Sequence, residues 1–154
     1  MKLQKATEFA LYAVLELAAD PSRQLTAVEI AEKYGISAHH LAKVLRDLGR
    51  AGLVDAVRGV GGGYRFAGNA KRLTLMDVIR LFEDVGSDTD DVAPRPPGQD
   101  IAEGLRFVQA EIDAQTGATL RSISLATMLK LVARRPWSAA AETRPARRAA
   151  RRAR

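Results

Sequence analysis

Four side chains suited to contacting nucleic acid share one face of a predicted helix. The helix covers residues 36–50, and at spacings of four, three and four residues this face carries His39, Lys43, Arg46 and Arg50. Residues at these spacings lie on one side of an α-helix. Cationic and hydrogen-bonding groups along an exposed helix edge can reach phosphates and the edges of bases. The pattern therefore predicts a helix that lies in a groove of DNA.

The elements that must position this helix are its neighbours in the chain. Its opposite stripe is apolar and is predicted to face a core, with Leu41, Val44, Leu45 and Leu48. Upstream, Thr26 and Glu29 have the spacing of a capping box, which begins a second helix. Gly35 suits the left-handed residue that ends this helix, and Ser37 suits the N-cap of the next one. Two short helices joined by a tight glycine turn form a helix-turn-helix.

A glycine-rich hairpin follows the two helices. Residues 53–58 and 64–66 are short strand-like runs, and residues 59–63 between them read Gly-Val-Gly-Gly-Gly. This arrangement predicts a β-hairpin wing whose tip has almost no side chains. Such a backbone can approach a phosphate or a minor groove closely, while Arg58 and Arg65 at its base supply positive charge.

The predicted DNA contacts come from both motifs. They are Ser37, His39, His40, Lys43, Arg46, Arg50, Arg58, Gly59, Gly61, Gly62 and Tyr64. Arg58 ends an apolar strand directly before Gly59, so its side chain can project toward a neighbouring groove. A second interpretation stays open, in which Arg58 only pairs with a nearby acid such as Asp55 on the protein surface.

Together these motifs resemble one known family. The likeness is carried by Val28-Glu-Ile-Ala-Glu32, Tyr34-Gly-Ile-Ser37, Ala51-Gly-Leu-Val54 and, above all, Val57-Arg-Gly-Val-Gly-Gly-Gly-Tyr-Arg65. Over roughly residues 1 to 135 the chain is similar to the Rrf-type winged-helix regulators, the family of IscR and NsrR. The resemblance implies a homodimeric, sequence-specific DNA-binding transcriptional regulator that acts as a repressor. It also implies that Arg58 enters the minor groove.

The chain departs from this family where a cofactor would bind. In the cluster-binding members, three cysteines in the region of residues 87–98 hold an iron–sulfur cluster, but this chain has no cysteine. Iron–sulfur clusters need thiolate ligands, and histidine replaces only some of them. The sequence therefore predicts a family member without the cluster, and it predicts no other cofactor or metal.

Residues 87–98 read Ser-Asp-Thr-Asp-Asp-Val-Ala-Pro-Arg-Pro-Pro-Gly and offer almost nothing to bury. An exposed, mobile loop is therefore expected. Asp88, Asp90 and Asp91 have a superficial likeness to a calcium-binding loop. Because the glycine and the distant bidentate glutamate of an EF-hand are missing, a solvated acidic loop is the better interpretation.

The helices outside the DNA-binding motifs are predicted from apolar spacing and caps. A mostly buried helix covers residues 5–19 and braces the helix-turn-helix. Another begins after Thr74 and ends at Gly86, with inward side chains from Leu75, Val78, Ile79 and Phe82.

A longer helix begins at residues 100–103 and is predicted to end at Gly117. Its apolar residues step by four, three and four, the spacing of a heptad seam, at Ile101, Leu105, Val108 and Ile112. This seam suits a dimer, as the family resemblance implies, although packing against the chain's own core stays open. A last short helix follows Ser124, and residues 134–136 close the folded part.

The predicted architecture is mainly α with a small β-hairpin wing. A winged helix-turn-helix domain covers residues 1–85, an exposed acidic and proline-rich loop residues 86–99, dimerisation helices residues 100–136, and a disordered arginine-rich tail residues 137–154. A chain of 154 residues suits one such domain with an extra helix or tail.

The formal net charge of +6 is concentrated in the tail. Lysine plus arginine against aspartate plus glutamate gives 9 and 7 for residues 1–66, 9 and 10 for residues 67–136, and 6 and 1 for residues 137–154. DNA binding by the winged domain therefore depends on where a few cations point. The tail itself suits either a non-specific DNA-gripping arm or a solubilising segment.

Other functions find little support. His39 and His40 are neighbours that point about 100 degrees apart on a helix, so they neither chelate one metal nor form a catalytic relay. Residues 59–63 lack the Lys-Ser/Thr of a P-loop and lie between strands. Charges within the first helix exclude a membrane span or a signal-peptide core there.

We therefore expect a cytoplasmic DNA-binding regulator that is not an enzyme and has double-stranded operator DNA and a second copy of itself as partners. The alternative is a winged-helix protein-interaction module without specific DNA binding. The sequence leaves open the operator, the direction of regulation, and whether the signal is a small molecule, a partner protein or abundance alone. A pocket between the helix of residues 75–85 and the dimer helix is the predicted place for an effector.

Overall fold

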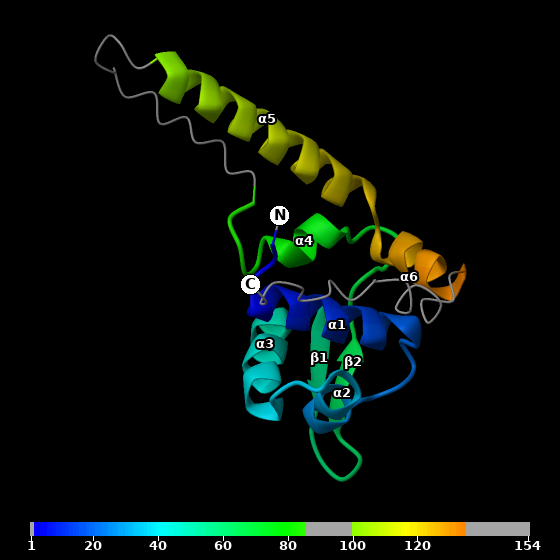
Figure 1. The fold of residues 1–154 in the computed structure, drawn as a ribbon. Coiled ribbons are helices and arrows are strands. Elements are labelled where there is room, and N and C mark those ends of the chain that lie inside the picture. The colour runs from blue at the N-terminus through cyan, green and yellow to red at the C-terminus, as the bar shows by residue number, and fades with distance from the viewer. Residues whose placement is uncertain (1, 86–99, 135–154) are drawn as a thin grey trace, which may run out of the picture.

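A computed structural model describes residues 2–85 and 100–134 of the chain. In order, the elements are α1 (Lys5–Ala19), α2 (Ala27–Tyr34), α3 (Ala38–Arg50), β1 (Val54–Val57), β2 (Gly63–Phe66), α4 (Leu75–Ile79), α5 (Asp100–Ser122) and α6 (Leu125–Arg134) (Figure 1). The predicted class, mainly α with a small hairpin and a long C-terminal helix, is confirmed. The predictions for residues 86–99 and 135–154 lie outside the described residues.

The core forms around α1, which lies against α3, α4, β2 and α6. One broad face of α1 is buried, with Ala10, Ala13, Val14 and Leu17, so the helix braces the helix-turn-helix as predicted. The fully buried large side chains of the core include Leu17, Ile30, Leu41, Leu45, Leu48 and Leu125. Burying such a side chain contributes about 1.5–3 kcal/mol, which makes this cluster the main source of stability for the described fold.

The wing is an antiparallel pair whose register runs from Val54 opposite Phe66 to Val57 opposite Gly63. Each strand differs by a residue or so from the predicted runs, and Arg58 lies just beyond β1. A further bridge extends the sheet, because Leu25 and Tyr64 exchange both backbone hydrogen bonds, at 2.9 and 2.7 Å. The wing is therefore anchored to the segment that connects α1 to α2.

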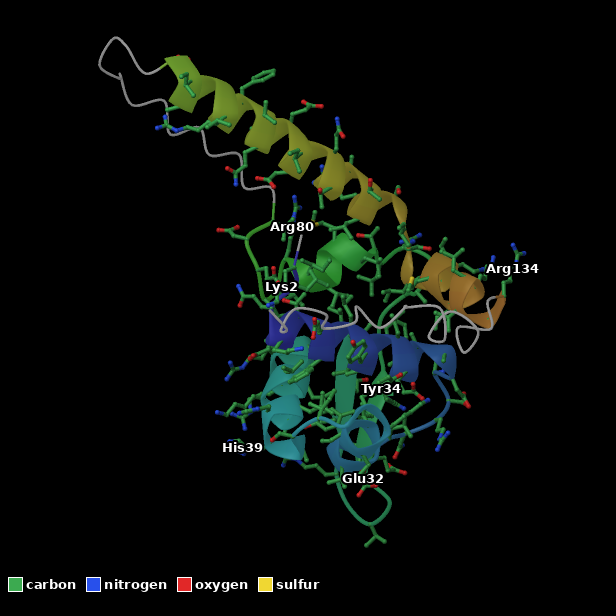
Figure 2. The ribbon with its side chains drawn as sticks, viewed as in Figure 1. Lys2, Glu32, Tyr34, His39, Arg80 and Arg134 are labelled. Carbon is green, nitrogen blue, oxygen red and sulfur yellow. The ribbon has the colours of Figure 1, made fainter. Side chains whose placement is uncertain are left out.

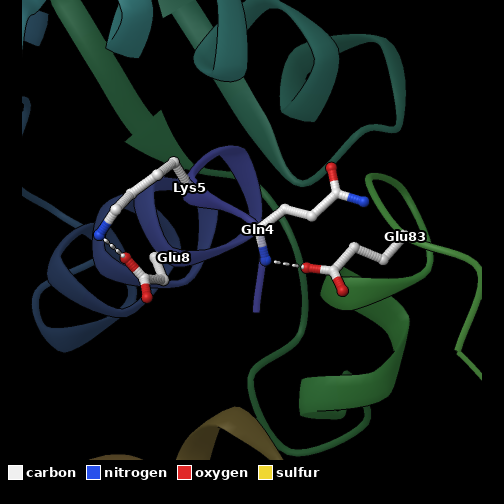
Figure 3. A network of polar contacts seen from close by, with 4 residues as sticks. All are labelled: Gln4, Lys5, Glu8 and Glu83. Carbon is white, nitrogen blue, oxygen red and sulfur yellow. Dashed lines mark hydrogen bonds and ion pairs between the residues drawn. The ribbon is translucent and has the colours of Figure 1, made fainter. Parts of the chain in front are cut away.

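The helix predicted to run from Thr74 to Gly86 is shorter than expected. Thr74 caps it as predicted, but α4 ends at Ile79 and tight turns follow. The cause is Glu83, whose carboxylate accepts a hydrogen bond from the backbone N–H of Gln4 at 2.6 Å (Figure 3). The buried Thr7 hydroxyl donates to the same oxygen. A carboxylate that accepts from a free amide at the start of α1 is stabilising there, and Glu83 reaches it from the turns that follow α4.

The long helix does not end at Gly117, as had been predicted, but continues to Ser122. Gly117 is buried, and a Cβ at this position would lie 3.2 and 3.3 Å from the Arg121 guanidinium nitrogens and 3.4 Å, an ordinary contact distance, from the Met76 side chain of α4. The glycine therefore lies where α5 meets α4, and the helix tolerates its cost of about 1 kcal/mol.

Most of α5 extends away from the rest of the described fold (Figure 1). The C-terminal end of α5 lies close to the rest of the fold, because α6 follows directly and is attached there. The backbone N–H of Leu125 in α6 donates a hydrogen bond to the Leu73 carbonyl at 2.8 Å. Within residues 2–85 and 100–134, none of the helices combines the length and apolar character needed to cross a membrane.

Candidate nucleic-acid interface

The turn between α2 and α3 is built by short-range hydrogen bonds that the sequence predicts. Thr26 and Glu29 form the capping box, with the Thr26 N–H donating to the Glu29 carboxylate at 2.7 Å. Gly35 is left-handed, with φ 62° and ψ 38°, and the Ile36 N–H donates to the Ala31 carbonyl at 2.9 Å. These contacts close α2 and set the direction in which α3 starts.

A polar cluster ties the last turn of α2 to α1. The Glu16 carboxylate of α1 accepts hydrogen bonds from the Lys33 ammonium at 2.6 Å and from the Tyr34 hydroxyl at 2.7 Å. The Tyr34 ring also stacks on Tyr12, with ring centroids 4.8 Å apart. Burial and the bond to Glu16 raise the pKa of Tyr34 well above its usual range. Tyr34 directly precedes Gly35, so this cluster positions the entry to α3.

Helix α3 has the two faces that its sequence predicts. The apolar stripe of Leu41, Val44, Leu45 and Leu48 is buried, with at most 5% of any of these residues exposed. The opposite edge is exposed and carries His39, His40, Lys43, Arg46 and Arg50. Ser37 is the N-cap, and its hydroxyl accepts from the His40 N–H at 3.4 Å.

The cations on this edge differ in how far they are neutralised. In the last turn of α3, the Arg50 guanidinium lies 3.5 Å from the Asp47 carboxylate. Neither Lys43 nor Arg46 forms an ion pair with any carboxylate among residues 2–85 and 100–134. The positive charge available to an external anion is therefore greatest in the middle of the helix.

The wing tip is a tight turn that requires its glycines for its own geometry. The Gly62 N–H donates to the Gly59 carbonyl at 3.0 Å, and Gly59 and Gly61 have φ angles of 106° and 75°. A Cβ on Gly62 would lie 2.4 Å from the Val57 carbonyl oxygen, which is a collision with backbone. These glycines were predicted to contact DNA because their backbone can approach it closely. The structure shows that each is first needed to fold the wing.

The two arginines at the base of the wing differ in their ion pairing. Asp55 lies opposite Arg65 in the register, and their side chains approach to 3.5 Å. The interpretation in which Arg58 pairs with Asp55 is therefore wrong. Arg58 is exposed and has no ion-pair partner in the part of the chain that the structure describes.

Tyr64, predicted as a DNA contact, serves the fold in two ways. Its backbone pairs with Leu25, and its half-buried side chain packs against the core. A DNA contact by Tyr64 stays a prediction, as do the contacts predicted for the other site residues.

The start of α3 and the wing loop lie at one end of the molecule, away from α5 (Figure 1). His39 marks this end on α3, and Glu32 of α2 lies there as well (Figure 2). This end of the molecule therefore carries positive charge on α3 and at Arg58, but it also includes the acidic side chain of Glu32. Val60, the only side chain in the wing tip larger than hydrogen, was not predicted as a site residue, although the glycines on either side of it single it out.

A surface cavity of about 540 Å³ lies beside α1 and α2, lined by Glu16, Arg23, Leu25, Glu29, Ile30, Glu32 and Lys33. It is not at the predicted place between α4 and α5. Among the described residues, no group of three or more His, Cys, Asp or Glu side chains could hold a metal ion. The whole sequence has no cysteine, so its residues do not fit an iron–sulfur cluster.

A helix-turn-helix followed by a two-stranded hairpin defines the winged-helix class of DNA-binding folds. Comparison with known proteins agrees. The Rrf2 family, described as iron-dependent transcriptional regulators, matches residues 3–131. A curated relative from Rhodopseudomonas palustris, named "Putative HTH-type transcriptional regulator BadM", is 54% identical over 132 residues, or 86% of this chain and 83% of the relative.

Two solved structures have the same fold. CymR, the global cysteine regulator of B. subtilis, superposes with a TM-score of 0.70 at 23% identity, covering 85% of this chain and 98% of CymR. IscR of T. potens gives a TM-score of 0.66 at 27% identity, covering 86% of this chain and 88% of IscR. The chain belongs to the Rrf2 family, and it is a winged helix-turn-helix DNA-binding transcriptional regulator.

Proposed function

We propose that this regulator works in the cytoplasm as a homodimeric repressor of a two-fold symmetric operator. One α3 helix per subunit enters the major groove and one wing reaches toward the flanking minor groove. Two-fold pairing then separates the two α3 helices by about 34 Å, one turn of DNA, or a multiple of it. Two subunits bound across a promoter would exclude the polymerase.

The observation that carries the proposal is the division of the molecule into two ends. At one end lie the start of α3 and the wing loop (Figure 1), and the cations Lys43, Arg46 and Arg58 on these two elements are exposed, as a phosphate-binding surface requires. At the other, α5 exposes its predicted seam: Ile101, Leu105, Val108 and Ile112 are 82, 66, 53 and 57% exposed. Apolar side chains at heptad spacing gain free energy when a second helix covers them.

The experiment is DNA binding by the purified full chain. It should bind a fragment from upstream of its own coding sequence more tightly than unrelated DNA of equal length at the same salt concentration. Titrating salt measures the phosphate contribution, because each neutralised phosphate adds about 0.9 to the slope of log affinity against log salt. Equal binding to both fragments at every salt concentration would leave the protein-interaction module as the better interpretation.

The activity of this protein must be regulated without an iron–sulfur cluster. No thiolate is present to ligate iron, to react with nitric oxide or to be oxidised, so a small ligand, a partner protein or abundance must act instead. Anaerobically purified protein should be colourless. Stoichiometric iron with the visible absorption of a cluster would overturn this part of the proposal.

A further inference from the structure

The wing tip carries one side chain that nothing else in the described structure explains. Val60 is 112% exposed, the highest value of any large apolar residue among residues 2–85 and 100–134. It is not among the residues that form the core or pack against it. A fully exposed apolar side chain at a predicted interface gains free energy only when a partner covers it.

The turn holds Val60 at a fixed corner. The hydrogen bond between Gly62 and Gly59 makes residues 59–62 a β-turn, in which Val60 is the second residue and Gly61 the third. The positive φ of Gly61 together with the negative φ of Val60 defines a type II turn. Because Gly62 cannot accept a side chain, the valine is the one apolar group that this turn presents.

We propose that Val60 is an apolar contact to the minor groove of operator DNA and that it discriminates against guanine there. The inference rests on the proposed DNA-binding function. DNA is the indicated partner because Val60 lies two residues from the unpaired Arg58, and the wing's single acid, Asp55, is paired with Arg65. The wing loop also projects from the same end of the molecule as the start of α3 (Figure 1).

The discrimination follows from what the minor groove exposes. In the minor groove, A·T pairs expose only hydrogen-bond acceptors, whereas G·C pairs also expose the guanine N2 amino group, which protrudes into the groove. A valine cannot accept a hydrogen bond from that amino group and would desolvate it, which is costly. Val60 therefore favours base pairs that lack the amino group, independently of their major-groove edges.

Inosine separates this contact from other sources of preference, because I·C pairs have the major groove of G·C but lack the N2 amino group. The probe is the upstream fragment with A·T, I·C or G·C pairs at the step under the wing. Val60→Ala should weaken binding to the A·T and I·C forms about 3–10-fold, as expected for two lost methyl groups, and leave the G·C form nearly unchanged. Val60→Thr, which keeps the shape and adds an acceptor, should shift preference toward G·C.

Salt dependence distinguishes Val60 from Arg58. Val60→Ala removes no charge, so its salt slope should equal that of the wild type, whereas Arg58→Ala should lower the slope by about 0.9 if it neutralises one phosphate. Val60→Ala should also leave the melting temperature unchanged.

Three outcomes overturn the inference: unchanged affinity of Val60→Ala on all three probes, an equal loss on all three, or a loss accompanied by a reduced salt slope. If the wild type itself does not prefer its upstream fragment to unrelated DNA, the proposed function fails together with this contact. If the wild type prefers it and Val60→Ala binds identically, only the contact fails.

Discussion

Helices α3 and α5 both carry an apolar stripe in sequence but have opposite surroundings in the structure. The four large apolar residues step by three, one and three on α3 and by four, three and four on α5, and both patterns place them on one helix face. On α3 the four are at most 5% exposed, whereas on α5 the predicted seam is 53–82% exposed. The comparison shows that periodicity indicates an apolar face but not what covers it. Helix α3 is covered by α1 and α2 of its own chain. No element among residues 2–85 and 100–134 covers the predicted seam of α5.

The largest effect should come from shortening a core side chain of α3. Leu45→Ala should lower the free energy of unfolding by about 2–5 kcal/mol, because it leaves a cavity where Leu45 is fully buried. Leu105→Ala, the matched change on α5, removes the same atoms from a side chain that is 66% exposed. Denaturant unfolding at a concentration low enough to separate subunits should show little change for Leu105→Ala.

Similar losses of unfolding free energy for Leu45→Ala and Leu105→Ala at low protein concentration would contradict this difference between α3 and α5. They would mean that α5 packs against its own chain in solution, the alternative that its sequence leaves open.

The next effect concerns self-association. Val108→Asp places a charge within the predicted seam and should raise the dimer dissociation constant by at least about 30-fold, or 2 kcal/mol, as loss of an interface hot spot does. Phe107→Asp is the control, because Phe107 is 74% exposed but its position lies about 100 degrees away around the helix. Sedimentation velocity over a concentration series measures both. If Phe107→Asp dissociates the dimer and Val108→Asp does not, a different face of α5 pairs the subunits.

The part of the fold that follows from short-range chemistry could be predicted from the sequence. The capping box at Thr26, the left-handed Gly35 and the Ser37 cap involve residues at most a few positions apart, and the structure contains all three. Each has a side-chain or φ requirement that few residue types meet. The two faces of α3 follow from its spacing in the same way.

The errors arose where a distant residue decides the local structure. Helix α4 ends early because Glu83 binds the start of α1, 79 residues away from Gln4. Gly117 does not end α5 but lies within it, where the helix meets Met76 of α4. Neither contact leaves a signal within the local sequence. Which cation of the wing is neutralised was likewise decided by cross-strand register, which pairs Asp55 with Arg65.

A third prediction compares cations on the same two helices. Lys43→Ala should weaken operator binding by about 1–3 kcal/mol without changing stability, because Lys43 is exposed and unpaired within the described residues. Arg106→Ala removes an exposed cation from α5 and should leave DNA affinity unchanged. A lost base contact would relax discrimination at one operator position, while a lost phosphate contact would weaken all sequences alike. Unchanged binding by single alanine variants of His39, Lys43 and Arg46 would exclude this edge as the contact surface.

A fourth prediction concerns the wing, where the two arginines differ in pairing. Arg58→Ala should lose about 1 kcal/mol or more of operator affinity when the flanks are A·T-rich, because a narrow minor groove has the most negative potential. Arg65→Ala should lose less, since Asp55 already neutralises part of its charge. Binding to operators with A·T-rich and G·C-rich flanks measures the difference. Equal losses for Arg58→Ala on both flanks would leave it only a phosphate contact.

The smallest expected effect concerns the hydrogen bonds by which Glu16 of α1 holds Lys33 and Tyr34 of α2. Burial alone would raise the pKa of Glu16, but hydrogen bonds from Lys33 and Tyr34 outweigh it and lower the pKa below its ordinary value of 4.5. A carboxyl whose pKa is lower in the folded state stabilises the fold above the unfolded pKa, and this contribution is lost as the pH falls through the folded pKa. Glu16→Gln should therefore reduce stability at pH 7, by no more than about 1 kcal/mol because the pair lies at the surface.

The difference between Glu16→Gln and wild type should shrink as the pH is lowered from about 5 through the region below 4.5, where the wild-type carboxyl becomes neutral as well. Thermal unfolding at a series of pH values measures it. The control is Glu111→Gln on α5, whose carboxylate accepts a hydrogen bond from the Gln115 amide of the same helix at 2.8 Å. It ties no second element to α5, so it should change the melting temperature little at any of these pH values. A stability difference for Glu16→Gln that stays constant from pH 7 to pH 3 would show that packing of the side chain, and not its charge, holds α2 against α1.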